Sequence, residues 1–186
     1  MKNVEKKLRR RVASSMIVAS LAVASLTATN AIAAVDMFLK LDGIAGESTD
    51  AKHANEIDVL AWSWGASEQA RSQRSTGQAF CPQALSLTKY IDRATPVLLT
   101  KAATGDSIAN AKLTVRKAGA NPVDYVVMTF TGVRVASIST GGSGGEDRLT
   151  EVVAFNFSSA TVTYTPQKAD GSPDSPVTST VGASCS

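Results

Sequence analysis

The sequence predicts an all-β fold: a small, bent, Greek-key-like β-barrel of two sheets with one short flanking α-helix. Most segments after residue 34 alternate apolar and polar residues with a period of two, which is typical of half-buried strands. Two of these segments change the parity of the alternation part-way along, which predicts strongly bent strands. After the N-terminal segment, only one stretch carries clear helix signals. Bent strands with a single helix favour a small barrel or sandwich over a flat, open sheet.

Residues 1–33 have the pattern of a secretory signal peptide. Basic residues gather at positions 2–11, an apolar stretch of small residues follows at 14–27, and an Ala-x-Ala sequence ends at Ala33. This order predicts cleavage between Ala33 and Ala34, and export of the remaining chain to the periplasm or the medium. An uncleaved membrane anchor is the alternative, because residues 16–35 approach the ~20 residues that span a bilayer.

The basic character of the chain belongs to this leader. The 186 residues carry 19 Lys and Arg against 16 Asp and Glu, a net charge of +3. Six of the bases and one of the acids lie in residues 1–33, so the rest carries 13 bases against 15 acids. Because nucleic-acid binding needs clustered basic residues, we expect no nucleic-acid partner. Membrane contact is expected only through an uncleaved leader.

The first strand after the leader is predicted at residues 35–41, where Met37, Leu39 and Leu41 share one face. Residues 42–55 follow as a loop rich in Gly, Asp, Ser and Thr. Its fourteen residues exceed the usual connection of ~4–6 residues, and loops of this length are often functional.

A second strand is predicted at residues 57–64. Its apolar residues lie on both faces, with Ile57, Val59 and Ala61 on one side and Leu60, Trp62 and Trp64 on the other. We therefore expect the core to cover one face and a helix or a partner subunit to cover the other. The two Trp side chains could form a sugar platform, but packing in a core or an interface is their commoner role. The polar residues 65–78 are predicted to be an exposed loop.

The helix is predicted after a strand at residues 85–91. Thr95 is expected as its N-cap and Pro96 as its first residue, and the helix continues through residues 97–103 and ends at Gly105. A further strand is predicted at residues 111–117.

The two segments with a parity change are residues 123–138 and 150–164. The change falls at Gly132 in the first and at Ser158 and Ser159 in the second, which predicts a bulge or bend at each place. The remaining tail is rich in Pro, Ser, Gly and Asp and is expected to be loosely ordered. The predicted organisation is a signal peptide at 1–33, a barrel domain at 34–165 and a Pro- and Ser-rich tail at 166–186.

We expect no catalytic residue, no cofactor site and no metal site. Asp50 and His53 are close in sequence and could ligate a metal, but one His among scattered carboxylates is more typical of a solvated loop. The Gly-rich residues 141–148 lack the Lys-Ser/Thr ending and the following helix of a phosphate-binding loop, so they predict a hairpin-like loop. A Ser–His–Asp triad could draw only on His53.

Five blocks of the sequence carry a family resemblance. They are VDMFLKLDGIAGESTDAKHANEIDVLAWSWGAS at 35–67, LSLTKYIDRATP at 85–96, AKLTVRKAG at 111–119, STGGSGGEDRLTE at 139–151 and TYTPQKADG at 163–171. In this order they resemble the Hcp family, the tube protein of type VI secretion, over about residues 34–175.

The resemblance implies a structural protein that forms six-membered rings and is not an enzyme. Such rings stack into a secreted tube that a contractile sheath propels, end in a VgrG-type spike and carry small effector proteins. The loop at 42–55 corresponds to the loop that the family uses between stacked rings, which implicates Asp42, Gly43, Gly46, Glu47, Asp50 and His53. The alternative is an exported monomeric binding module or secreted effector that keeps the fold without assembling a tube.

Three features depart from the family pattern. Family tube proteins carry no N-terminal signal, residues 67–80 replace a region that is usually Gly-rich, and SPVTSTVGASCS at 175–186 replaces an aromatic closing strand. Loss of that strand would expose a sheet edge and weaken ring closure. Because an exported protein meets an oxidising compartment, we expect a disulfide between Cys81 and Cys185 that tethers the tail. Two unrelated thiols are the alternative.

Overall fold

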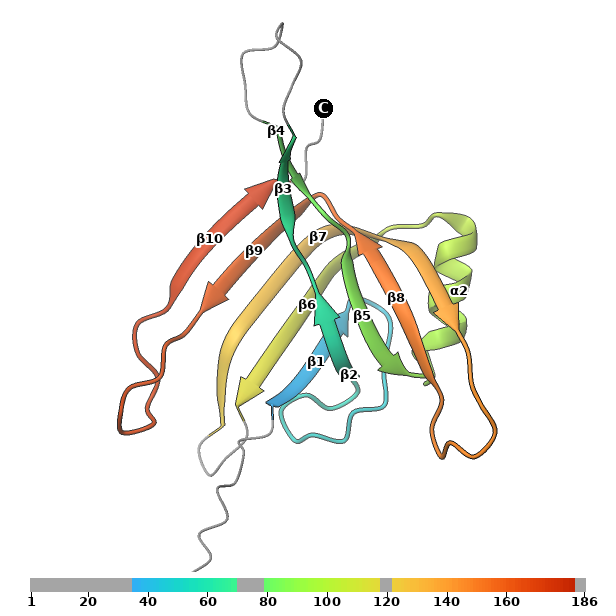
Figure 1. Ribbon diagram of the computed structural model, residues 1–186, viewed down its shortest axis with the longest axis horizontal. Helices are drawn as coiled ribbons and strands as arrows, with labels where there is room; N and C mark the ends of the chain where they lie inside the picture. The colour runs from blue at the N-terminus through green and yellow to red at the C-terminus, as the bar shows by residue number, and fades with distance from the viewer. Residues whose placement is uncertain (1–34, 70–78, 118–121, 183–186) are drawn as a thin grey trace, which may run out of the picture. The chain divides into compact units, whose positions relative to one another are not determined.

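The computed structural model describes residues 35–69, 79–117 and 122–182 (Figure 1). The predicted signal peptide, with its cleavage site at Ala33 and Ala34, lies outside the described residues. In chain order the elements are β1 (Val35–Leu41), β2 (Ile57–Ser63), β3 (Ala66–Gln69), β4 (Ala79–Pro82), β5 (Leu85–Tyr90), α2 (Ala94–Thr104), β6 (Ile108–Lys117), β7 (Val123–Thr140), β8 (Thr150–Asn156), β9 (Ser159–Tyr164) and β10 (Val177–Gly182). Within the described ranges, no helix has the length and apolar character needed to cross a membrane.

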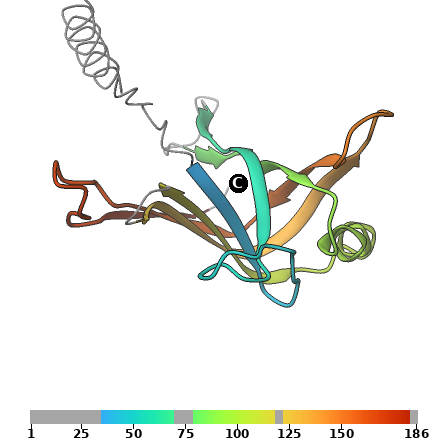
Figure 2. The same ribbon diagram turned by 90° about the horizontal axis from the view of Figure 1, so that it is seen from below.

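Six antiparallel strands close into a barrel in the order β7-β6-β1-β2-β5-β8, because β8 pairs back onto β7. The long strand β7 makes this closure possible: its first part pairs with β6 and β9, and its last part pairs with β8. β9 and β10 extend the sheet beyond β7, on the side of the barrel away from α2 (Figures 1 and 2). The prediction of a bent, mainly β barrel with a flanking helix is confirmed.

Apolar side chains from successive strands meet in register inside the barrel. Leu39 on β1 lies opposite Leu113 on β6, which lies opposite Met128 on β7, and all three are buried. Burying a side chain of this size contributes about 1.5–3 kcal/mol to folding. Rows of this kind, repeated along the strands, give the barrel its core.

β7 bends at Gly132, as the parity change predicts. Gly132 has a φ of +59°, and a Cβ at this position would collide with the side chain of Ser158. Met128 and Phe130 face the core before the bend and Val133 faces it afterwards. The predicted break near Ser158 is also present. Residues 150–164 nevertheless form two strands, β8 and β9, because their halves pair with different parts of β7.

The N-cap of α2 is Arg93, so the prediction of Thr95 is wrong. Thr95 lies inside the first turn and is buried. Its Oγ1 donates to Glu151 Oε1 at 2.8 Å and lies 3.3 Å from Lys89 Nζ. The hydroxyl that would cap the helix is therefore used in a tertiary hydrogen-bond network. The helix ends at Thr104, directly before Gly105, as predicted.

The tail contains a strand, so the expectation of a loosely ordered segment without a closing strand is wrong. β10 pairs with β9 along all six of its residues. The hydroxyls of Thr178 and Thr180 lie 3.0 and 2.9 Å from those of Thr163 and Thr161. Alternating Val and Thr residues suit a strand, although the surrounding Pro and Ser residues obscure the pattern.

Two expectations near β2 are also corrected. A bulge at Leu60 reverses the alternation, so Trp62 and Trp64 pack against the core and Ala61 faces outward. Part of the loop predicted at residues 65–78 forms the strand β3, which pairs with β4.

Candidate functional site: assembly surfaces of the barrel

Residues 42–56 form an ordered loop in which most residues are exposed and four are buried. Ile44, Gly46 and Ser48 are buried and alternate with exposed residues. The N–H of Gly46 donates to the carbonyl of Asn55 at 2.8 Å, and the N–H of Ser48 donates to that of Glu56 at 2.9 Å. Gly46 lies so close to Glu56 that any Cβ would collide with its carbonyl group. The two halves of the loop are therefore tied together by their backbones.

Arg116 on β6 holds the centre of this loop. Its Nη1 and Nη2 donate to Asp50 Oδ1 and Oδ2 at 3.0 and 2.6 Å, and Nη2 also donates to Asp36 Oδ2 on β1 at 3.0 Å. The Arg116 side chain is only 8% exposed. The hydrogen bonds from Arg116 hold the pKa of Asp50 well below its usual range, and those to Asp50 raise the pKa of Arg116. The pair therefore stays ionised at neutral and mildly acidic pH.

An aromatic stack attaches the second half of the loop to β1. The His53 ring lies parallel to the Phe38 ring, with centroids 4.2 Å apart, and the Arg116 guanidinium lies 4.9 Å from the same Phe38 centroid. His53 Nδ1 lies 2.9 Å from Glu56 Oε2, and Nε2 lies 3.9 Å from Asp124 Oδ1. Phe38 points to the outer face of β1, so the loop covers an apolar side chain that would otherwise meet solvent.

The six loop residues predicted at contacts between rings differ in exposure: Asp42, Gly43 and Glu47 are exposed, Asp50 is partly buried, and Gly46 and His53 are buried. The exposed three can reach a partner, whereas the buried ones maintain the shape of the loop. Within the described ranges, no cluster of three or more His, Cys, Asp or Glu residues has the arrangement of a metal site.

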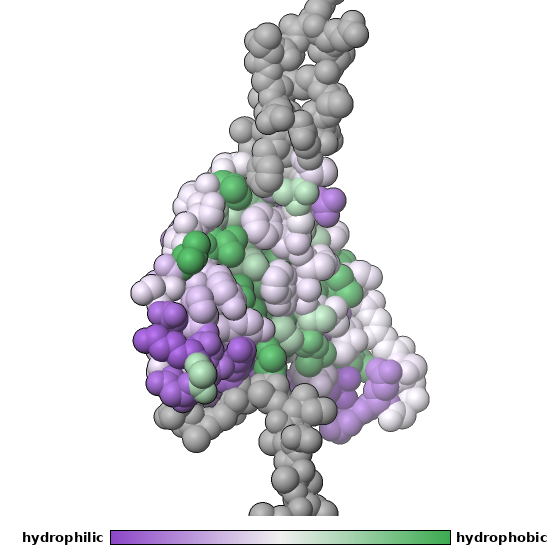
Figure 3. All heavy atoms as spheres, turned by 60° about the vertical axis from the view of Figure 1, so that its left-hand side comes forward, coloured by the Kyte–Doolittle hydropathy of each residue, from purple (hydrophilic) through white to green (hydrophobic). Residues whose placement is uncertain are grey.

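An apolar ledge projects from the barrel on β9 and β10. We use this name for Val162, Tyr164, Val177 and Val181, which continue the core-facing side of the sheet beyond β7. Val162 and Val181 pack against the core, but the directly opposed Tyr164 and Val177 are 49% and 67% exposed. Figure 3 shows this side of the molecule, with hydrophobic residues among pale, weakly polar ones and the strongly hydrophilic residues gathered toward the lower end.

Two registered rows on the outer surface of β2, β5, β8 and the end of β7 carry small, uncharged side chains, with Tyr90 and Arg134 beyond them. We call this surface the uncharged face. One row is Ala61, Thr88, Val152 and Ser139, and the other is Ser63, Ser86, Ala154 and Ser137. Val152 at its centre is exposed. Within the described chain this outer face of β2 is uncovered, and the Trp side chains that suggested a second cover pack against the core instead.

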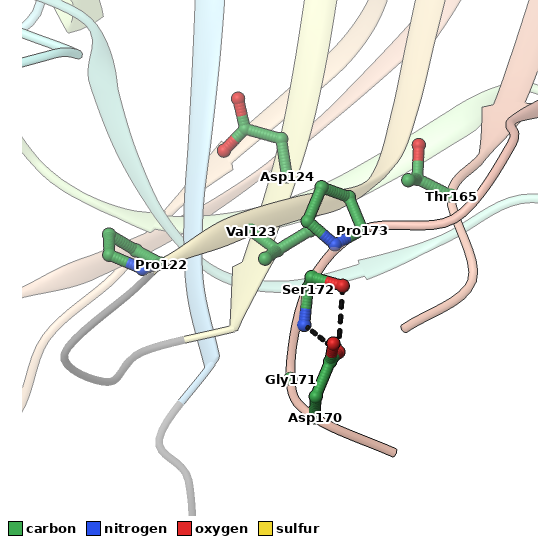
Figure 4. Close-up of a pocket in the computed structure, with 8 residues that line it drawn as sticks. All are labelled: Pro122, Val123, Asp124, Thr165, Asp170, Gly171, Ser172 and Pro173. Atoms are coloured by element: carbon green, nitrogen blue, oxygen red, sulfur yellow. Dashed lines mark hydrogen bonds between the residues drawn. The ribbon is translucent and has the colours of Figure 1, made fainter. Parts of the chain in front are cut away.

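A polar pocket of about 580 Å³ lies between the start of β7 and the segment that joins β9 to β10 (Figure 4). Its lining includes two carboxylates, Asp124 and Asp170. The hydroxyl and the N–H of Ser172 donate to Asp170 Oδ1 at 2.7 and 2.9 Å and lower the pKa of Asp170. These bonds stabilise a turn. The residues that line the pocket do not combine a nucleophile with a histidine base, so the arrangement does not resemble a hydrolytic site.

The predicted disulfide joins one residue inside the described ranges to one outside them. Cys81 lies in β4 opposite Ser67, but Cys185 lies outside the described residues, so the disulfide stays a prediction. The role of Arg116 is not evident from its local sequence pattern. A register between β1 and β6 that places Asp36 opposite Arg116 would have suggested its role.

Comparison with known proteins gives a consistent picture. The profile of the family described as "Type VI secretion system effector, Hcp" matches residues 38–164. The chain is 52% identical over 145 residues to Protein hcp1 of Pseudomonas aeruginosa, which covers 76% of this chain and 90% of that protein. Hcp1 from Salmonella typhimurium matches the fold with a TM-score of 0.69 at 39% identity, over 80% of this chain and 95% of that one. A type VI secretion system effector from Yersinia pestis matches with a TM-score of 0.65 at 35% identity, over 79% of this chain and 99% of that one.

Proposed function

Because this chain belongs to the Hcp family and is a tube protein of type VI secretion, we propose that it assembles into six-membered rings that stack end to end. A closed ring repeats one heterologous contact, so each subunit must offer two different surfaces that fit each other. The apolar ledge and the uncharged face are two such surfaces on one protomer.

The proposal of ring closure rests on the exposure of Tyr164 and Val177, which lie opposite each other on β9 and β10. Apolar side chains that continue a core beyond its own barrel mark a surface that a partner covers. The uncharged face can receive them without burying an unpaired charge, and Val152 supplies an apolar contact at its centre. Both surfaces therefore suit contact between copies of this chain.

Stacking of the rings is assigned to the loop of residues 42–56, through its exposed Asp42, Gly43 and Glu47. As in the family, the remaining partners are a VgrG-type spike, a contractile sheath and small effector proteins carried by the rings. The role is structural, and we assign no catalytic residue or cofactor.

Export through the leader is part of the proposal, and so is the disulfide between Cys81 and Cys185. We expect N-terminal sequencing of the protein from periplasm and medium to begin at Ala34, and non-reducing digestion to release one peptide pair that contains both cysteines. An intact Met1 on the secreted protein would contradict the cleaved leader. Free thiols at both positions would contradict the bridge.

The alternative, an exported monomeric binding module, loses one of its two supports. It depended on the leader and on the absence of a closing strand, and β10 is present. The leader is still compatible with it, so the oligomeric state decides between the two functions.

Replacement of Val177 by Asp tests ring closure. A carboxylate in the centre of an apolar contact is expected to weaken assembly by about 100-fold or more, while the exposed position leaves the fold of the protomer intact. Size-exclusion chromatography with light scattering should give a six-subunit mass for the wild type and a lower mass for Val177→Asp.

The matched control is Thr178→Asp, which places the same charge on the opposite face of the same strand, where the carboxylate can still accept a hydrogen bond from the Thr163 hydroxyl. It should keep the six-subunit mass. A ring that survives Val177→Asp, or that is lost equally in both variants, would show that the ledge does not close the ring.

A further inference from the structure

We propose that Arg116 is the positioning residue that holds the loop of residues 42–56 in the conformation that docks onto a neighbouring ring. This inference deepens the proposed tube function and rests on it. Arg116 is nearly buried and lies on a barrel strand, so it has little surface to offer a second ring. It acts through the loop residue Asp50.

The carboxylate of Asp50 joins the barrel to the backbone of the loop. On one side it receives the two guanidinium bonds from Arg116. On the other side its Oδ1 accepts the N–H groups of Lys52 and His53 at 2.9 and 3.1 Å. These bonds form the turn that leads into the stack of His53 on Phe38. A single ion pair therefore fixes both the position of the loop and its internal turn.

The guanidinium is itself held from the barrel side. Asp36 on β1 accepts from Nη2, and the Phe38 ring lies beside the guanidinium. The two carboxylates that bind Arg116 thus have different origins, because Asp36 belongs to the barrel and Asp50 belongs to the loop. This difference allows the two roles to be separated by mutation.

A second arginine contacts the same loop in a different setting. Arg93 Nε lies 3.7 Å from Glu47 Oε1, and both side chains are exposed. Ion pairs of this kind contribute little to stability. The pair of Arg116 with Asp50 is largely desolvated and two-pronged, which makes it both stronger and more exact in geometry. Arg93 therefore serves as a matched control.

Stacking and ring closure should be separable. Neither the apolar ledge nor the uncharged face includes Arg116, Asp50 or Asp36. Loss of the ion pair between Arg116 and Asp50 should therefore release the loop without altering the surfaces that close the ring.

The test compares Asp50→Asn with Asp36→Asn in the full-length protein, alongside Arg116→Met, Arg116→Lys and Arg93→Met. Amide hydrogen exchange is measured at residues 44–56, ring mass by light scattering, and stacked tubes by electron microscopy. Asp50→Asn and Arg116→Met should speed exchange in the loop by about 10-fold or more, keep the ring mass and shorten or abolish tubes. Arg93→Met should resemble the wild type, and Asp36→Asn should have a clearly smaller effect than Asp50→Asn because it leaves both Asp50 bonds in place. Arg116→Lys should recover part of the loss because a lysine keeps the charge without the two-pronged geometry.

Wild-type tubes in Arg116→Met or Asp50→Asn would overturn the proposal. So would equal effects of Asp36→Asn and Asp50→Asn, since these would indicate a role for Arg116 in the barrel alone. If Arg116→Met does not fold, Asp50→Asn decides the question, because it leaves the Asp36 bond in place. Absence of rings in the wild type would instead contradict the tube function, and the loop exchange rates would then still report whether Arg116 holds the loop.

Discussion

Replacing Lys89 by Met is expected to destabilise the barrel by about 3–5 kcal/mol, the usual consequence of removing one partner from a buried ion pair. Lys89 Nζ lies 2.8 Å from Glu151 Oε1 and 2.8 Å from Asp92 Oδ1, and it also donates to the carbonyl of Tyr90 at 2.7 Å. The side chains of Lys89 and Glu151 are 1% and 0% exposed. Without the ammonium group, two carboxylates lie close together away from water.

The double variant Lys89→Met/Glu151→Leu separates this effect from a loss of packing. It removes both buried charges of the central pair, so its free energy of unfolding should recover much of the loss seen in Lys89→Met. Urea unfolding followed by circular dichroism measures both variants. A double variant that is less stable than Lys89→Met would contradict the assignment, because it would mean that Glu151 stabilises the barrel without its partner.

Replacing Phe130 by Ala is expected to cost about 3–5 kcal/mol as well, for a reason that involves no charge. Phe130 is buried next to the bend in β7, and its ring centroid lies 4.8 Å from that of Phe157 and 5.9 Å from that of Trp64. Truncation leaves a cavity between the barrel strands and removes two aromatic contacts. Trp64 should report the change through its fluorescence.

Phe130→Leu is the graded control, because it retains most of the side-chain volume. It should lose less stability than Phe130→Ala and shift the Trp64 emission less. Equal losses in the two variants would indicate that ring contacts, and not the cavity, dominate at this position. A loss below about 1 kcal/mol in Phe130→Ala would contradict its place in the core.

The parts of the fold that could be predicted are those where burial follows local periodicity. β5 and β8 alternate cleanly because one face of each meets the core. The bends at Gly132 and near Ser158 are visible because a bend shifts the parity of that alternation. The order of six barrel strands depends on pairings between distant segments, and these leave no mark on a local pattern.

β10 was missed because its stability does not come from a buried face. It is an edge strand in which Val177 is exposed, and hydroxyl pairs such as Thr178 with Thr163 hold it against β9. A segment with few buried apolar residues and several Ser and Pro neighbours is typical of a tail. Only its pairing with β9 shows that this segment is a strand and not an irregular tail.

The candidate site could also be predicted only in part from the sequence. The length and composition of residues 42–55 indicate a functional loop, but not that Ile44, Gly46, Ser48 and His53 within it are buried. The loop is held by two residues of the barrel. Arg116 is distant in sequence from Asp50, which it binds, and Phe38, which stacks on His53, points away from the core. Charged residues such as Lys89 and Arg116 are normally placed on the surface by pattern rules, because those rules carry no information about a partner that neutralises them.

Electron microscopy of the secreted protein tests the proposed ring and tube assembly most directly. Rotational averaging of negatively stained particles should give rings with six-fold symmetry, and concentrated samples should contain stacks of such rings. Particles the size of one subunit at every concentration, or closed rings of a different symmetry, would contradict it.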